Sequence, residues 1–216
     1  MAEHPTISAY FVRHGIVNGN DVNRNWRADP PLTSSGDIEA LGNILKDSGT
    51  HPSIIYTSPY ERCIQTADIL AKILNTRFHK DERLRERAFE LESGKYFPSN
   101  PYETEGFSIE SWQTITARML QIWYHAVTTH PKKELMFVSH GDPLAFLLWA
   151  LLNQQKKPDF NLLKHFPYML GRGDCLKVDF TPELEVVNYK LFTPIAQNNS
   201  ISYAFFEDTN DWDQEY

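Results

Sequence analysis

The sequence predicts a three-layer α/β/α sandwich with a mostly parallel central sheet. Three short apolar segments, at 7–12, 53–57 and 134–139, are typical of buried strands, and each is followed by residues that favour a helix. Strands that alternate with helices in this way favour a parallel sheet covered by helices on both faces. The chain has 216 residues, of which 41% are hydrophobic, so it is long enough for one domain, 1–216, with a sizeable core.

The first strand, at 7–12, leads into the Arg-His-Gly sequence at 13–15. Further along, Thr33 or Ser34 can cap the helix that follows, because a hydroxyl oxygen accepts a hydrogen bond from the first turn. Apolar residues then recur at helical spacing until the Ser-Gly pair at 48–49, which is typical of a helix end. We therefore expect one strand and one helix in this region.

The second strand, at 53–57, is followed by Ser-Pro at 58–59, a side-chain cap followed by the residue favoured at the first helical position. The predicted helix extends to about Leu74. Arg62 falls in its first turn, near the tip of the preceding strand. A further strand at a sheet edge is expected within 78–84.

The second half of the chain begins with a long predicted helix over 109–129, which has a stripe of apolar residues along one face. The third buried strand, 134–139, follows, and the Asp-Pro pair at 142–143 repeats the pattern of a cap and a proline at a helix start. The segments 174–180 and 184–190 alternate in polarity and predict an antiparallel hairpin.

Three segments lack regular periodicity. A polar loop at 18–31 and a lid-like insertion at about 87–107 interrupt the pattern, and an irregular tail begins at about 192. Long irregular segments inside a compact domain are often functional. We therefore expect the loop and the lid-like insertion to set substrate preference.

Composition excludes several classes of function. The net charge is −7, so the surface offers no general attraction for nucleic acid or for an anionic membrane. The longest apolar stretch, 143–152, is too short to span a membrane, and the N-terminus has no signal-peptide pattern. Cys63 and Cys175 are expected to be buried thiols in a reducing compartment. These features predict a soluble, cytoplasmic protein.

Charged and imidazole side chains follow each of the three buried strands. Because ligands of parallel α/β sheets bind beyond the carboxyl ends of the strands, Arg13, His14, Arg62 and His140 are expected to converge. The guanidinium groups of two arginines offer paired donors with permanent charge, as a phosphoryl group in transfer requires. This convergence predicts a phosphoryl-binding site.

The same residues suggest a reaction. Nearby positive charge disfavours imidazolium, so His14 is expected to be neutral and available as a nucleophile, while His140 donates a hydrogen bond to the phosphoryl group. The leaving alkoxide needs a proton, which a carboxylic acid can supply. Glu86, Glu90 and Glu92 all lie in the appropriate region of the sequence.

Other phosphate chemistries fit less well. A cysteine phosphatase needs an arginine six residues after its cysteine, where this chain has Ile69 and Thr181. Neither an aspartyl-phosphate motif nor a glycine-rich nucleotide-binding loop is present in the sequence. Only the fragment at 140–142 suggests a metal ligand set, so we expect no metal and no cofactor.

At these residues the chain resembles the histidine phosphatase superfamily, in its phosphoglycerate mutase-like group. The segments 13–15, 58–67 and 138–141 match the family's three motifs in order, and 31–36 matches the start of its first helix. The resemblance extends over about 7–190. It implies the phosphoglycerate mutase-like form of the three-layer fold.

The resemblance also implies a role for each residue. His14 becomes transiently phosphorylated, while Arg13, Arg62 and His140 bind the phosphoryl group. The Leu-Arg-Glu sequence ending at Glu86 matches the segment that holds the proton donor, so the resemblance selects Glu86 among the three glutamates. No metal is implied.

The expected activity is hydrolysis of a small-molecule phosphate ester by a metal-independent phosphomonoesterase. Asn20 and Gly141 are further candidates for substrate contact. The mutase branch usually carries a Trp-Asn pair soon after the first motif, whereas this chain has Ile-Val-Asn-Gly-Asn at 16–20, which favours water as the acceptor. The alternatives are mutase-type phosphoryl transfer and a phosphate-binding regulatory protein with little turnover. The sequence gives no indication of oligomeric state.

Overall fold

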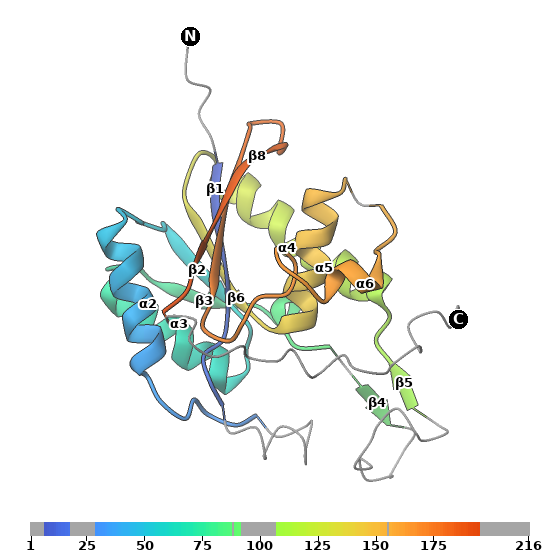
Figure 1. Ribbon diagram of the computed structural model, residues 1–216, viewed down its shortest axis with the longest axis horizontal. Helices are drawn as coiled ribbons and strands as arrows, with labels where there is room; N and C mark the ends of the chain where they lie inside the picture. Colours follow the sequence, from blue (N-terminus) through green and yellow to red (C-terminus); the bar gives the residue numbers. More distant parts are fainter. Residues whose placement is uncertain (1–6, 18–28, 88, 92–106, 155, 195–216) are drawn as a thin grey trace.

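The structure is a computed structural model that describes residues 7–17, 29–87, 89–91, 107–154 and 156–194 (Figure 1). Asn20 and most of the lid-like insertion lie outside the described residues. The tail predicted from about 192 also lies outside them beyond residue 194.

A six-stranded sheet with the order β3-β2-β6-β1-β7-β8 forms the centre of the fold. Its strands are β1 (Ile7–Arg13), β2 (Ile54–Thr57), β3 (Phe78–Lys80), β6 (Leu135–Ser139), β7 (Cys175–Phe180) and β8 (Val186–Phe192). The first four pair in parallel, while β7 runs antiparallel to β1 and β8 antiparallel to β7. The mostly parallel sheet and the final hairpin are therefore both confirmed.

Helices cover both faces of this sheet (Figure 1). The helices are α2 (Gly36–Asp47), α3 (Glu61–Ile73), α4 (Trp112–Thr129), α5 (Gly141–Leu152) and the short α6 (Phe160–Leu163). Alternate residues of β1 face the two layers: Phe11 lies in the core formed with α4 and α5, and Val12 lies in the core formed with α2 and α3. This two-residue alternation of a buried strand produces the three layers that the sequence predicts.

The register of the parallel strands places their carboxyl ends at one edge. Arg13 at the end of β1 is paired with Ser139 at the end of β6, and Thr57 of β2 is paired with Val138 of β6. The residues that directly follow these strands therefore meet at the same place. The parallel β3 is shorter than the 78–84 segment predicted for it, because the Asp81 side chain accepts a hydrogen bond from the Arg83 amide at 2.9 Å and starts the 3₁₀ turn η1 (Glu82–Leu84).

The predicted caps of two helices were wrong. The helix α3 begins two residues after the predicted proline start, with Tyr60 as N-cap, and the Ser58 hydroxyl is instead 2.8 Å from His140 Nε2. Likewise α5 has His140 as its N-cap, while the carboxylate of Asp142 pairs with Arg87 at 3.7 Å. Both polar side chains are used by the cluster at the sheet edge rather than by their own helix.

The other helix starts differ less. The helix α2 begins at Gly36 after Ser35, and the Ser34 hydroxyl accepts a hydrogen bond from the Gly36 amide at 3.1 Å. Thr33 does not cap this helix, because its hydroxyl donates to the Ile16 carbonyl at 3.0 Å. The predicted helix start was therefore correct to within two residues, but neither predicted residue is the N-cap, and Ser35, which is, makes no capping hydrogen bond with its side chain.

The lid-like insertion contains two short strands that the sequence analysis did not predict. The strand β4 (Phe89–Leu91) pairs antiparallel with β5 (Phe107–Ile109) in a separate two-stranded sheet. The helix predicted from residue 109 consequently begins at Trp112, and the Ser111 hydroxyl caps it by accepting from the Thr114 amide at 3.2 Å. Apolar residues ahead of the cap belong to the strand rather than to the helix.

The two cysteines are free and buried, as predicted. Cys63 lies in α3 and Cys175 begins β7, and both belong to the core on the α2–α3 face. Within the described part of the chain, no helix combines the length and the apolar character that crossing a membrane requires.

Candidate active site

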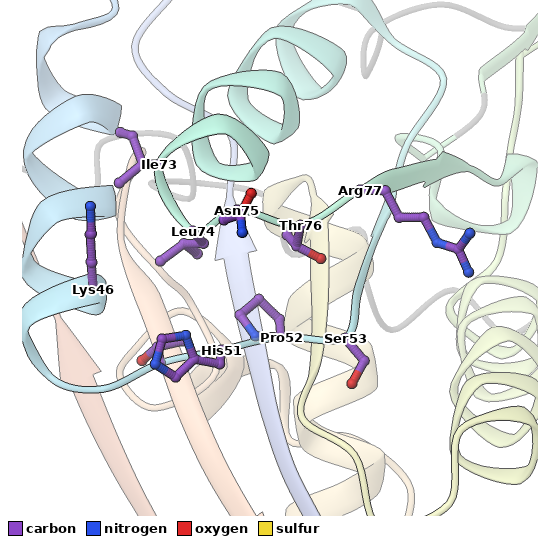
Figure 2. Close-up of a pocket in the computed structure, with 10 residues that line it drawn as sticks. Lys46, His51, Pro52, Ser53, Ile73, Leu74, Asn75, Thr76 and Arg77 are labelled. Atoms are coloured by element: carbon purple, nitrogen blue, oxygen red, sulfur yellow. The ribbon is translucent and has the colours of Figure 1, made fainter.

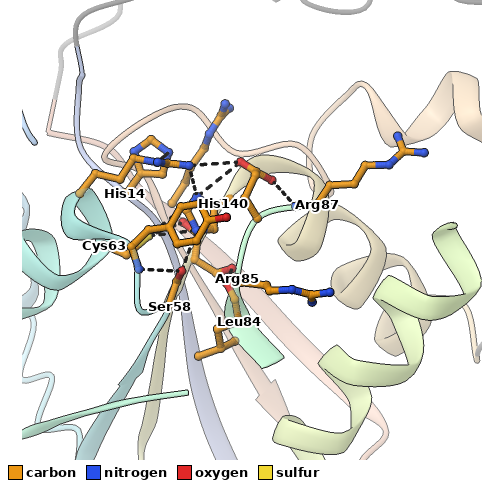
Figure 3. A network of polar contacts seen from close by, with 12 residues as sticks. His14, Ser58, Cys63, Leu84, Arg85, Arg87 and His140 are labelled. Carbon is orange, nitrogen blue, oxygen red and sulfur yellow. Dashed lines mark hydrogen bonds and ion pairs between the residues drawn. The ribbon is translucent and has the colours of Figure 1, made fainter. Parts of the chain in front are cut away.

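The structure brings the predicted residues of the three strand tips together. Arg62 Nε lies 3.2 Å from His14 Nε2, and Arg62 Nη2 lies 3.0 Å from His140 Nδ1. The two imidazole rings meet edge to face, with their centroids 5.3 Å apart. We refer to Arg13, His14, Arg62 and His140 as the phosphoryl cradle; Figure 3 shows His14 and His140 within the polar network.

The orientation of His14 fixes which nitrogen can react. Its Nδ1 lies 2.8 Å from the carbonyl oxygen of Gly15, an acceptor only, so Nδ1 carries the proton and donates it. Nε2 is therefore the unprotonated nitrogen, and it faces Arg62 Nε. Burial, and next the charges of Arg62 and Arg13, hold the pKa of His14 well below its usual range. The ring is thus neutral at physiological pH, with its lone pair directed into the site.

Gly15 and Gly141 provide the space that the phosphoryl cradle needs. A Cβ atom at Gly15 would lie 2.9 Å from the Ile38 side chain, and one at Gly141 would lie 3.2 Å from the Arg13 guanidinium. Arg13 is anchored by donating from Nη1 to the Leu170 carbonyl at 2.7 Å. Gly141, a predicted substrate contact, therefore has a visible steric role beside the arginine.

Arg62 is the hub of the phosphoryl cradle. It is 6% exposed, and its guanidinium also forms an ion pair with Asp29, whose Oδ1 lies 3.3 Å from Nη1. The other oxygen of Asp29 accepts a hydrogen bond from the Glu61 amide at the start of α3, at 2.6 Å. Sequence patterns did not point to Asp29, because it lies within the irregular loop at 18–31, where no strand or helix pattern places it.

Ser58 orients His140, a role that the sequence analysis also missed. Its hydroxyl is 2.8 Å from His140 Nε2 and accepts a hydrogen bond from the Tyr60 amide at 3.4 Å. Arg62 Nη2 can only donate, so His140 Nδ1 accepts from it at 3.0 Å, and the ring proton lies on Nε2, which donates to the Ser58 hydroxyl. Burial, and next the charge of Arg62, lower the pKa of His140 well below its usual range.

Glu86 lies in the loop at 82–87, which we call the acid loop. Its Oε2 lies 3.4 Å from His140 Nδ1 and 3.7 Å from Arg62 Nη2, and its Oε1 accepts from the Arg87 amide at 3.0 Å. Burial, and next the negative charge of Asp142, raise the pKa of Glu86 to about 7, against the opposing effect of Arg62. A carboxyl group with this pKa is partly protonated at neutral pH and can donate a proton.

Two further glutamates were candidate proton donors. Glu90 lies in β4, and Glu92 lies outside the described residues. Glu86 therefore stays the predicted donor, and it is the one that the structure places against the phosphoryl cradle.

A third arginine near the phosphoryl cradle was not identified from the sequence. Burial, and next the positive charges of Arg13 and Arg62, lower the pKa of Arg172. Its loop is fixed to the site because the Gly173 amide lies 3.1 Å from the carbonyl oxygens of both Arg13 and His14. A lone arginine between two glycines, just before a strand, was the available signal, but neither periodicity nor a motif marks it.

The site's chemistry is concentrated at one end of the sheet. A cavity of about 690 Å³ lies near the opposite end, where Lys46, His51 and Arg77 line it beside the start of β2 (Figure 2). The predicted site residues that the structure describes do not line that cavity. Among the described residues, no group of three or more His, Cys, Asp or Glu side chains is arranged to hold a metal ion.

Together the fold and the cluster define a class: an α/β protein with a phosphoryl-binding cluster of histidines and arginines at the carboxyl edge of its parallel strands. The chain belongs to the histidine phosphatase superfamily (branch 1), whose family profile matches residues 9–168. The family resemblance stated from the motifs is therefore confirmed, and it supports a phosphatase or a mutase.

Curated relatives include both activities. An uncharacterised phosphatase, PhoE of Bacillus subtilis, is 27% identical over 148 residues, which cover 64% of this chain and 74% of the relative. A 2,3-bisphosphoglycerate-dependent phosphoglycerate mutase of Corynebacterium kroppenstedtii is 36% identical over 86 residues, which cover 37% of this chain. The chain matches about a third, 34%, of the length of that mutase.

Solved structures share the fold. A mycobacterial glucosyl-3-phosphoglycerate phosphatase superposes with a TM-score of 0.65 at 19% identity, covering 87% of this chain and 98% of that protein. YhfR of Bacillus stearothermophilus superposes with a TM-score of 0.64 at 25% identity, covering 84% of this chain and 94% of that protein. The three-layer fold and its phosphoglycerate mutase-like form are therefore confirmed.

Proposed function

We propose that this protein is a metal-independent phosphomonoesterase that hydrolyses a small-molecule phosphate ester through a phosphohistidine at His14. One observation carries the proposal: the unprotonated Nε2 of His14 lies beside Arg62, while Glu86 approaches the same guanidinium from another side. A nucleophile (His14), a positively charged hydrogen-bond donor (Arg62) and an acid (Glu86) thus lie around the position where a phosphoryl group would bind. This is the set of groups that transfer of a phosphoryl group to a protein nitrogen requires.

Substrate binding rearranges contacts of Arg62. In the structure its donors point at His14, His140 and Asp29. The phosphoryl oxygens, being better acceptors than a neutral imidazole, take these donors as the phosphate enters. Arg13 supplies further donors, so the transferring group is surrounded by fixed positive charge and hydrogen-bond donors.

In the first chemical step, His14 Nε2 attacks phosphorus and a P–N bond forms. The bond between phosphorus and the ester oxygen breaks, and its electron pair stays on the leaving oxygen. Glu86 transfers its carboxyl proton to that oxygen, so an alcohol leaves and Glu86 becomes a carboxylate. The Nδ1 proton of His14 remains hydrogen-bonded to Gly15 throughout, which keeps the ring in one orientation.

In the second step, a water molecule attacks phosphorus and the P–N bond breaks, returning its electron pair to His14 Nε2. The carboxylate of Glu86 accepts the proton that the water loses. Inorganic phosphate leaves, and both side chains recover their initial protonation. The same carboxyl group thus acts first as acid and then as base.

The first test is hydrolysis of 4-nitrophenyl phosphate by the purified protein in the presence of a chelator. We expect turnover that the chelator does not reduce, and we expect His14→Ala to lose it, with a fall in kcat of about a thousandfold or more. Turnover that persists in folded His14→Ala protein would contradict the phosphohistidine mechanism. Phosphate binding without turnover in the wild-type protein would support a regulatory role instead.

Mutase-type transfer is a second candidate, favoured by the 36% identity to a phosphoglycerate mutase over 86 residues. A mutase returns the phosphoryl group from histidine to a second hydroxyl of the same substrate rather than to water. Isotopically labelled phosphate that moves between positions of phosphoglycerate, faster than it is released, would establish this alternative. Release as inorganic phosphate alone would support the phosphatase.

A further inference from the structure

The backbone of the acid loop is held by one side chain from α4. Arg118 Nη1 donates to the Arg83 carbonyl at 2.6 Å and to the Arg85 carbonyl at 2.9 Å. Its Nη2 donates to the Glu86 carbonyl at 3.3 Å. Three carbonyl oxygens within four residues thus depend on a single guanidinium.

Arg118 is itself fixed by a buried carboxylate. Its Nε lies 2.8 Å from Glu110 Oε1 and its Nη2 lies 3.0 Å from Glu110 Oε2, a bidentate ion pair. The side chains of Arg118 and Glu110 are only 10% and 5% exposed. A bidentate pair with this little exposure has one strongly preferred geometry, because two parallel hydrogen bonds fix the plane of the guanidinium.

The same pair connects the acid loop to the base of the β4–β5 hairpin. Glu110 directly follows β5, and its carbonyl oxygen accepts from Arg87 Nε at 3.0 Å. Arg85 Nη2 approaches Glu110 Oε1 at 3.2 Å, so this one carboxylate contacts two arginines. Towards the phosphoryl cradle, the Leu84 carbonyl accepts from the Ser139 hydroxyl at 2.7 Å, one residue before His140.

These contacts leave the Glu86 side chain as the part of the acid loop that faces the phosphoryl cradle. Its carboxylate approaches Arg62 and His140 at 3.7 and 3.4 Å. The sheet does not fix Glu86 as the strand tips fix His14, because the acid loop begins with the 3₁₀ turn η1 and follows the edge strand β3 rather than a central strand. A carboxyl group that must reach a leaving oxygen within hydrogen-bond distance therefore depends on how its loop is supported.

We propose that Arg118, held by Glu110, is a positioning residue that directs the Glu86 carboxyl group at the leaving oxygen. The inference rests on the proposed function, in which Glu86 protonates that oxygen. It adds that Arg118 and Glu110, which are distant from the reacting atoms, specifically affect protonation of the leaving oxygen. A purely structural ion pair would instead affect binding, chemistry and stability alike.

The test compares two aryl phosphates that differ in their need for an acid. 4-Nitrophenolate leaves readily without a proton, whereas phenolate is a poorer leaving group that benefits from protonation. The measured quantity is kcat/KM, which covers the steps through release of the phenol. In Arg118→Lys, which keeps the charge but lacks the fork, we expect phenyl phosphate turnover to fall about tenfold or more, and 4-nitrophenyl phosphate turnover by about threefold or less.

Glu110→Gln is the second variant, because it keeps the shape of Glu110 while removing the charge and one of the two oxygens that accept from Arg118. It should show the same selectivity, to a smaller degree. The matched control is Ile122→Val, which removes one methylene from a fully buried side chain one turn further along α4. We expect that control to lower the thermal unfolding temperature and to leave the ratio of the two kcat/KM values unchanged.

The outcomes separate this inference from the proposed function. Equal falls for both substrates in Arg118→Lys and Glu110→Gln would overturn the positioning role, provided that Glu86→Gln is selective in the same assay. Absence of selectivity in Glu86→Gln would remove the acid role of Glu86, and this inference with it. Selectivity in all three variants, but not in Ile122→Val, would establish the positioning role.

Discussion

The phosphoryl cradle and the acid loop shift the pKa values of their reactive side chains in opposite directions within the same site. In the phosphoryl cradle, burial and neighbouring arginines lower the pKa of His14, so a base is kept unprotonated. In the acid loop, burial and the neighbouring Asp142 raise the pKa of Glu86 to about 7, so the acid is partly protonated at neutral pH. Burial favours the neutral form of both groups, and a neighbour of like charge adds to it in each case: the arginines for His14 and Asp142 for Glu86.

The two regions also differ in how they are held in place. His14 and His140 directly follow central parallel strands, so the sheet register fixes their positions. Glu86 follows a short edge strand and a 3₁₀ turn, and the Arg118 side chain supports its backbone. The comparison indicates that binding and nucleophilic attack depend on the sheet, whereas proton transfer depends on side-chain contacts made by α4.

Removal of the central arginine of the phosphoryl cradle should have the largest effect on activity. In Arg62→Ala the transferring group loses a buried, charged donor, and we expect kcat/KM to fall about a thousandfold for phenyl and 4-nitrophenyl phosphate alike. The equal fall follows because Arg62 acts on phosphoryl oxygens, not on the leaving group. Steady-state kinetics with both substrates measures this.

A control for Arg62→Ala is available at the opposite end of the sheet. Arg77 is an exposed arginine beside the remote cavity (Figure 2), and Arg77→Ala should leave kcat/KM unchanged. A fall for phenyl phosphate that is much larger than the fall for 4-nitrophenyl phosphate would show that Arg62 acts mainly through Glu86. The proposed division between phosphoryl cradle and acid loop would then be wrong.

Loss of the acid should have a smaller and selective effect. In Glu86→Gln we expect kcat/KM for phenyl phosphate to fall about a hundredfold, because the phenolate must leave without a proton, and much less for 4-nitrophenyl phosphate. The Gln side chain keeps the size of the Glu side chain and an oxygen for the Arg87 amide, so the local packing and the Arg87 contact change little. A uniform fall for both substrates would contradict the acid role and point to a role in binding.

The same variant makes a prediction about stability. The pKa of Glu86 is raised in the folded protein, so its favourable contribution is present at low pH and is lost as pH rises through about 7. Glu86→Gln lacks a group that ionises. As pH rises from 5 to 8, the free energy of unfolding of the wild-type protein should therefore fall relative to that of Glu86→Gln. Urea unfolding at both pH values measures the difference, and a constant gap between the two proteins would show that the Glu86 carboxyl group is not perturbed.

The comparison between the two regions also explains which site residues could be predicted from the sequence. The strand tips were predictable, because buried apolar runs ending in Arg-His-Gly, Ser-Pro and Ser-His-Gly place their polar residues by topology alone. Ser58 was located correctly but given the wrong partner, since a cap pattern cannot reveal a hydrogen bond to a histidine 82 positions away. Its role follows from packing of β2 beside β6 rather than from local propensity.

The support of the acid loop was beyond the reach of the sequence. Arg118 lies on the predicted helix 109–129, where an arginine is most simply read as solvent-exposed, yet it is 8% exposed and contacts a loop more than 30 residues earlier. Glu110 was read as part of that helix, because the apolar residues of β5 continue its apparent pattern. Asp29 and Arg172 lie in loops without periodicity, so only the three-dimensional arrangement assigns them to the site.

Asp142 offers the smallest change and the sharpest test of why the two regions differ. Its negative charge raises the pKa of Glu86, and its own pairing with Arg87 at 3.7 Å balances a nearby positive charge. Asp142→Asn removes the like charge and also removes a negative charge that pairs with Arg87, and both changes favour ionised Glu86. We therefore expect the pKa of Glu86 to fall, so that kcat/KM for phenyl phosphate begins its decline at lower pH than in the wild-type protein, where the decline is centred near pH 7. Below that pH, where Glu86 is protonated in both proteins, their rates should agree to within about twofold.

Asp68→Asn, which removes an exposed carboxylate on α3 that pairs with Lys72, controls for net charge and should not move the profile. A profile that stays in place in Asp142→Asn, or moves to higher pH, would mean that burial alone keeps Glu86 protonated, and the electrostatic contrast between the acid loop and the phosphoryl cradle would then reduce to a difference in burial.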